Sequence, residues 1–113
     1  MTYASQDILI YSGDDKVITV TVYDNDDAIV DITGVTITWQ LSQNVSSAAL
    51  ITKTVGSGIT LSDPTSGVFT ITLDPADTNS LSGRYYHECE ITDSSSDVST
   101  GFVGHATIKK DAI

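Results

Sequence analysis

Apolar and polar residues alternate with a period of two along much of this chain, and that alternation constrains the fold most. In the run VTITWQLS (residues 35–42) every second residue is apolar, and KVITVTVYD (16–24) and VFTITL (68–73) repeat the pattern. Successive side chains of a strand lie on opposite faces, so each run gains one apolar and one solvated face. This is typical of antiparallel sheets that pack on one side. The residues expected to face inward are Ile18, Val20, Val22, Val35, Ile37, Trp39, Leu41, Phe69, Ile71 and Leu73.

Turn-forming residues separate these runs at short spacing. The turn signals include DNDD at 24–27, GSG at 56–58, DPTSG at 63–67 and DSSSD at 93–97. They predict strands at 6–11, 16–23, 35–42, 49–55, 59–62, 67–73, 84–92 and 98–109. A chain of 113 residues is enough for one domain. We therefore predict an all-β fold, a single immunoglobulin-like antiparallel β-sandwich of seven to eight strands. Residues 1–11 would form an N-terminal arm and edge strand, and residues 12–113 the sandwich.

One short segment, DPADTNSL (74–81), has the features of a helical turn. Asp74 suits the N-cap, Pro75 the first helical position, and Asp77 lies three residues after the cap. In immunoglobulin-like sandwiches such a corner precedes a strand with a tyrosine that bonds back to the corner backbone. Tyr85 or Tyr86 would fill that role.

The charge balance excludes several classes of partner. The formal charge is −10, and the chain has only five Lys and Arg. Nucleic acids and anionic membranes are bound through clustered cations, so we expect neither as a partner. No window approaches the roughly 18 apolar residues of a membrane-spanning helix, and the first residues lack the basic region of a signal peptide. One cysteine cannot form an internal disulfide, so the fold depends on packing.

The stretch GRYYHECEITD (83–93) holds one of the two histidines, the only cysteine and both glutamates. The strand pattern places Tyr85, His87, Cys89 and Ile91 on the inner face and Tyr86, Glu88, Glu90 and Thr92 on the outer face. His87 and Cys89 therefore cannot bind the same metal ion as the two glutamates. The three or four ligands that a zinc ion requires are not available on either face. A Cys–His nucleophile would also need a cleft and an orienting group. We interpret Cys89 and His87 as core residues and predict no catalytic or metal-binding role.

The acidic loop YDNDDAIVD (23–31) offers Asp24, Asp26, Asp27 and Asp31 as oxygen ligands, so calcium is one interpretation. The loop lacks the glycine and terminal glutamate of a helix-loop-helix calcium site. Asp and Asn are also the residues that a hairpin turn prefers, and we favour the turn. The GSG at 56–58 has no following lysine and reads as a hairpin or bulge rather than a phosphate loop. We predict no cofactor and no enzymatic activity.

The N-terminal segment suggests an interface. Ile8 and Ile10 are expected to pack on the core as an edge strand, whereas Tyr3 has no clear place in a small sandwich. Two interpretations stay open: an arm that reaches a neighbouring subunit, or a frayed terminus. Free sheet edges offer another route to assembly. The candidate contact residues are Tyr3, Ile8, Ile10, Asp24, Asp26 and Asp27.

The order of these segments resembles a known module. DITG before the Trp39 strand, SGITLSDPTSGVFTITL, and DPADT before GRYYHECEITD carry the resemblance, which runs from about Ser12 to Ile108. They are similar to the immunoglobulin-like N-terminal domain of the phage baseplate upper protein family and to related small virion proteins of tailed phages. These are turn and core motifs, and they do not indicate any catalytic or ligand-binding activity. The resemblance implies a structural module of the virion, made in the bacterial cytoplasm.

Because this chain departs from the larger members of that family, we expect a capsid decoration or cement protein, bound to the major capsid protein or another virion protein in many copies. The chain ends at Ile113, just after the last predicted strand, without the coiled coil or receptor-binding domain of larger members. We expect a homo-oligomer, specifically a trimer. The alternative is a baseplate, neck or tail-fibre adaptor. A further alternative is a host-surface or carbohydrate-binding module in which Tyr86, Tyr23 or Tyr11 stacks on sugars.

Overall fold

The computed structural model describes residues 4–5, 7–24 and 26–110, and this part of the chain is nearly all β. From Lys16 onward every predicted strand is present, with bounds within two residues of the prediction. Two short helical turns interrupt the strands: η1 (Pro64–Ser66) and α1 (Pro75–Thr78). The strands are β1 (Ala4–Ser5), β2 (Ile8–Tyr11), β3 (Lys16–Thr21), β4 (Thr36–Ser42), β5 (Ala49–Val55), β6 (Gly58–Asp63), β7 (Val68–Leu73), β8 (Gly83–Thr92) and β9 (Val98–Lys109).

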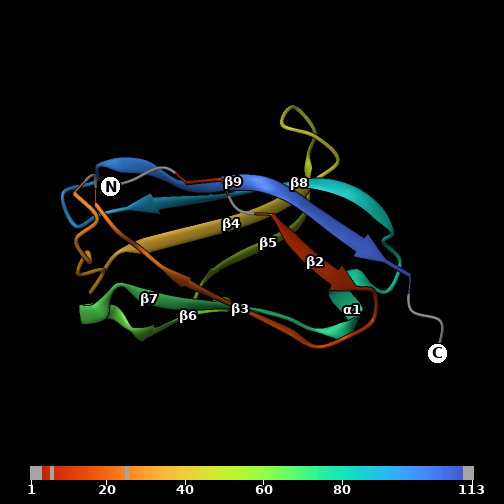
Figure 1. Cartoon of the computed structure of the whole chain (residues 1–113), viewed down its shortest axis with the longest axis horizontal. Helices are drawn as coiled ribbons and strands as arrows, with labels where there is room; N and C mark the ends of the chain where they lie inside the picture. Colours follow the sequence, from red (N-terminus) through yellow and green to blue (C-terminus); the bar gives the residue numbers. More distant parts are fainter. Residues whose placement is uncertain (1–3, 6, 25, 111–113) are drawn as a thin grey trace.

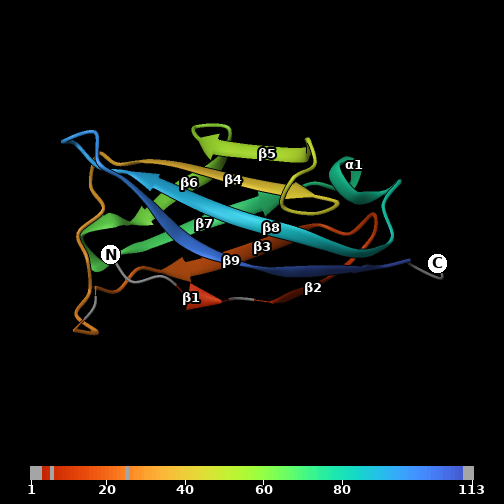
Figure 2. The same cartoon turned by 90° about the horizontal axis from the view of Figure 1, so that it is seen from above.

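The strands form two layers that are joined along one side. Figure 1 shows β9, β8 and β4 in one layer and β3, β6 and β7 in the other. The pairing order is β1-β9-β8-β4-β5-β6-β7-β3, and β2 also pairs with β9. A short pairing of β5 with β6 links the layers, so hydrogen bonds connect all the strands into one wrapped sheet. On the opposite side the sheet is open between β3 and the β1–β2 edge (Figure 2).

The all-β prediction is confirmed, but the sheet is mixed rather than purely antiparallel. β1 and β2 both run parallel to β9, and the two-residue pairing of β5 with β6 is also parallel. The other pairings are antiparallel. Alternation along a strand reports which faces are apolar, whereas the direction of a neighbouring strand depends on where the chain enters the sheet. The sequence pattern therefore contained no information on this point.

Both layers contribute their apolar faces to one core. All ten residues that the alternation placed inward are buried, and Trp39, Phe69 and Ile71 are fully buried. Ile32 was not among them, although it is also fully buried. It lies between β3 and β4, where its N–H donates to the Pro64 carbonyl oxygen at 2.9 Å. No strand pattern covers such a loop residue, so periodicity could not find it.

The predicted corner before β8 is present. The Asp74 N–H donates to Asp77 Oδ2 at 2.7 Å at the start of α1, and Lys53 Nζ lies 2.9 Å from the same oxygen. Of the two candidate tyrosines, Tyr85 makes the corner contact: its hydroxyl donates to the Ser82 carbonyl oxygen at 2.9 Å and accepts from the Ser82 N–H at 3.1 Å. Two bonds from one buried tyrosine thus fix the entry into β8.

Candidate functional site

The strand β8 carries the residues whose chemistry raised the question of a site, and their faces are those predicted. Tyr85, His87, Cys89 and Ile91 are buried, whereas Glu90 is exposed and Glu88 half-buried on the other face. The carboxylates and the His–Cys pair are therefore separated by the sheet itself. No group of three or more His, Cys, Asp or Glu side chains among the described residues is arranged to hold a metal ion.

His87 is a fully buried imidazole held by aromatic neighbours. Its Nδ1 accepts a hydrogen bond from Trp39 Nε1 at 3.1 Å. Its ring centroid lies 5.3 Å from that of Phe102 and 6.1 Å from that of Trp39. An Nδ1 that accepts from an indole carries no proton of its own. The imidazole thus satisfies the Trp39 donor inside the core, where an unpaired N–H would be costly.

Cys89 is equally unsuited to nucleophilic chemistry. Its side chain is fully buried. Burial first, and then the charges of Glu88 and Glu90, raise the pKa of the thiol to about 12. The thiolate is the reactive form of cysteine, and it is scarcely populated near neutral pH at such a pKa. Cys89 acts as a small apolar residue opposite Phe102, its partner on β9.

We expect Cys89 to resist alkylation by iodoacetamide in the native protein at pH 8 and to react fully in urea. The folded thiol stays protonated while the unfolded thiol ionises above its ordinary pKa of 9.0. The free energy of unfolding should therefore fall as the pH rises from about 9 toward about 12. A Cys89→Ala variant, measured in parallel, should lack this part of the pH dependence. Rapid labelling of the native chain would contradict the buried thiol.

In the acidic loop before β4, the carboxylates of Asp24 and Asp31 accept hydrogen bonds from the loop's own residues. Asp24 Oδ1 accepts from the N–H groups of Asp26 at 2.8 Å and Ala28 at 2.9 Å. Asp31 Oδ1 accepts from the Thr33 hydroxyl and N–H, and these two bonds lower the pKa of Asp31. Asp27 adopts a left-handed conformation with φ of 61°, which Asp tolerates better than most residues. These are turn functions, in agreement with the interpretation that the sequence favoured.

Two of the three N-terminal candidates, Ile8 and Ile10, lie in the sheet of their own chain. Ile10 is buried in the core and Ile8 is half-buried, as predicted for an edge strand. β1 and β2 pair with β9, so residues 4–5 and 8–11 form part of the sheet instead of a separate arm. Burial removes Ile10 from the residues that a partner can touch. Tyr3 lies outside the described residues.

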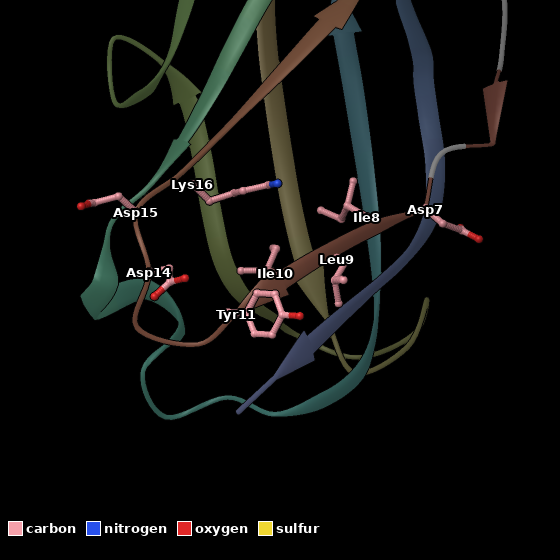
Figure 3. A pocket seen from close by; sticks show the side chains of 8 residues that line it. All are labelled: Asp7, Ile8, Leu9, Ile10, Tyr11, Asp14, Asp15 and Lys16. Atoms are coloured by element: carbon pink, nitrogen blue, oxygen red, sulfur yellow. The ribbon is translucent and has the colours of Figure 1, made fainter. Parts of the chain in front are cut away.

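The other face of β2 carries Leu9, which was not among the candidate contact residues, and Tyr11, which was named only as a residue that could stack on sugars. Leu9 and Tyr11 are 45% and 47% exposed. Figure 3 shows them on the side of β2 opposite to Ile8 and Ile10, beside a shallow hollow that residues 7–11 and 14–16 line. The alternation contained this signal, because Leu9 and Tyr11 each lie next to an inward-facing isoleucine and must therefore face outward.

Two sheet edges are open in the described part of the chain. Ser12 N–H donates to the Lys109 carbonyl oxygen, so the alternate residue Leu9 directs its backbone groups away from β9. On β3, Val22 N–H donates to the Gly67 carbonyl oxygen, which leaves the backbone groups of Val17 and Thr19 directed away from β7. Val17 is 58% exposed. Both edges thus combine available backbone groups with exposed apolar side chains.

A second hollow lies at the start of β8, on the outer face of the sheet. It joins the loop after β4 to the outer sides of β8 and β9. The residues that line it are Gln43, Asn44, Val45, Arg84, Tyr85, Tyr86 and His105. Sequence reasoning did not find this group, because its members come from three separate segments and share no motif.

No family model matches the chain, and no curated protein sequence matches it. The resemblance to phage baseplate domains therefore stays a prediction. Among residues 4–5, 7–24 and 26–110, no helix has the length and apolar character needed to cross a membrane.

Proposed function

We propose that this chain is a non-enzymatic structural protein of a tailed-phage virion, a capsid decoration or cement protein that binds the shell in many copies. The observation that carries the proposal is the combination of two open sheet edges, each with exposed apolar side chains, and a core that encloses the reactive side chains of β8. Leu9, Tyr11 and Val17 are available at these edges, whereas His87 and Cys89 are not. Such a surface favours binding of other proteins over chemistry.

The resemblance to the baseplate upper protein domain supports the virion location in this proposal. The segments that resemble the baseplate upper protein domain form the Trp39 strand, the β6–β7 hairpin and the corner before β8. They are the parts that build the core and its turns, which is what a rigid module of a virion requires.

Attachment in many copies fits the size of the contacts that such a chain can make. The described part of the chain measures 43 × 27 × 22 Å along its principal axes, so one copy can bury only a small interface. Weak single contacts become effective when many copies bind a repeating lattice, because each bound neighbour raises the effective concentration of the next. A stiff β module loses little conformational entropy when it binds.

The test is the copy number of this chain in purified particles, measured by quantitative mass spectrometry against the major capsid protein. We expect a number comparable to that of the capsid protein. A number close to that of portal or tail components would replace the decoration role by a baseplate, neck or tail-fibre adaptor. Complete absence from particles would reject both roles.

A further inference from the structure

The basic residues of this chain lie toward one end of its long axis, together with Asp14, Asp15, Asp74 and Asp77, whereas the other end carries acidic residues alone. Loop residues 22–24 and 26–35 and the turns at 63–67 and 93–97 lie together at one end of the molecule (Figure 1). These segments contain no Lys or Arg. We call this the acidic end, and its seven acids are Asp24, Asp26, Asp27, Asp31, Asp63, Asp93 and Asp97.

The cations lie toward the opposite end. Lys16 begins β3, Arg84 lies at the start of β8 and Lys109 ends β9. Lys53 forms an ion pair with Asp77 of α1. Figure 1 shows α1, the start of β8 and the end of β9 at the end opposite to the acidic loops. The molecule therefore carries an electrostatic asymmetry that its net charge of −10 does not reveal.

Arg84 and Lys109 form a local cationic surface beside His105. Arg84 lies opposite Thr107 on β9 and diagonal to His105 and Lys109, at a spacing of about 7–8 Å for such diagonal neighbours. Arg84, His105 and Lys109 are all exposed. Among the described residues, the structure records no hydrogen bond or ion pair of the Arg84 guanidinium. The Arg84 side chain is therefore open to an external partner as far as the described residues are concerned.

The hollow beside Arg84 has the composition of a carboxylate site. The guanidinium fork matches a carboxylate through two parallel hydrogen bonds. Two acids of the described residues near the hollow already accept hydrogen bonds: Asp7 Oδ1 accepts the His105 N–H at 2.9 Å, and Glu88 Oε1 accepts the Tyr86 hydroxyl at 2.9 Å. At the rim, Val45 is 73% exposed and offers an apolar contact beside the charge. We call this hollow, with Arg84 and His105, the cationic hollow.

We propose that the cationic hollow of one copy binds carboxylates at the acidic end of a second copy, so that copies associate head to tail. This inference rests on the proposed structural role and deepens it by naming a contact between copies. The acidic end supplies the complementary charge without a competing cation, and the exposed apolar side chains of Tyr23 and Ile29 lie within it. These side chains are suitable partners for Val45 at the rim.

The net charge does not prevent such contact. At physiological ionic strength the Debye length is about 8 Å, so charges at the far ends of two copies are screened from each other while the paired surfaces are not. A contact between two different surfaces is heterologous, and it produces rings where the rotation closes and filaments where it does not. A cyclic trimer is one such ring.

The experiment uses two variants, each with one surface removed. Arg84→Glu replaces the cation of the hollow by an anion, and the combined variant Asp26→Asn, Asp27→Asn and Asp97→Asn removes charge from the acidic end while it keeps side-chain shape. Sedimentation velocity at about 50 mM salt, where screening is weak, should show concentration-dependent association of the unaltered chain. Each variant alone should associate about tenfold or more weakly, because truncation of one partner of a charge pair is costly.

The decisive sample is the equimolar mixture of the two variants. It should form dimers and nothing larger, since each variant retains one functional surface and the two are complementary. Lys16→Glu provides the matched control: it makes the same charge change at the same end, outside the hollow, and should associate like the unaltered chain. Circular dichroism checks that every variant is folded.

Three results would overturn the proposal: an unaltered chain that stays monomeric, variants that associate normally, or a mixture that stays monomeric. In the first case, titration with N-acetylneuraminate, followed by NMR at Arg84 and His105, would reveal whether the hollow serves an acidic sugar instead. Copy number on particles is measured separately. A monomer that is abundant on capsids would reject this contact and leave the proposed function intact.

Discussion

Replacement of Trp39 by alanine should lower the free energy of unfolding by about 3–5 kcal/mol, the range for large aromatic residues truncated in a core. The indole is fully buried on β4, between β5 and β8. Truncation opens a cavity and also leaves Nδ1 of His87 without its donor. A buried acceptor that loses its partner adds its own desolvation cost. Urea denaturation followed by circular dichroism provides the measurement.

Trp39→Phe separates the two contributions. Phenylalanine keeps much of the buried volume and cannot donate to His87, so its cost should be smaller, about 1–3 kcal/mol. If the two variants were equally destabilised, the hydrogen bond to His87 would account for most of the effect and the cavity for little. A loss below about 1 kcal/mol for Trp39→Ala would contradict the central position of the indole in the core.

Gly67→Ala should be the second most damaging substitution. Gly67 has φ of 74°, and a Cβ built there would lie 2.7 Å from the Val30 carbonyl oxygen and 2.9 Å from that of Val22. Both contacts are with backbone, which cannot rotate away as a side chain can. The Gly67 carbonyl oxygen also accepts the Val22 N–H at 2.8 Å, which joins the turn after η1 to the end of β3. Movement of the turn would therefore disturb the sheet edge.

Gly34→Ala is the matched control for this prediction. Gly34 has a similar φ of 77°, but a Cβ there would meet nothing within 4 Å. Both variants carry the cost of a left-handed alanine, roughly 1–2 kcal/mol, and only Gly67→Ala adds the steric contact. We expect Gly67→Ala to exceed Gly34→Ala by about 1–3 kcal/mol, the usual cost of overpacking. Equal thermal unfolding midpoints would show that the turn relaxes without penalty.

The sequence alone was sufficient for the strands and for their faces. Alternation depends on neighbours two residues apart, and the same geometry acts inside every strand, so Trp39, Phe69 and Ile71 could be assigned to the core from their spacing. The corner before β8 was predictable for the same reason, because Asp74, Pro75 and Asp77 act on adjacent backbone groups. The burial of His87 and Cys89 followed from the face that their positions gave them.

Only the tertiary structure decided which segments meet. The parallel pairing of β2 with β9 joins residues almost one hundred positions apart, and no local pattern encodes the direction of a distant neighbour. The hydrogen bond between Trp39 and His87 spans 48 positions. Arg84 and His105 likewise share a surface through the register of β8 with β9. Faces are fixed by covalent geometry within a strand, whereas partners are fixed by the packing of the whole core, which one sequence without its structure does not reveal.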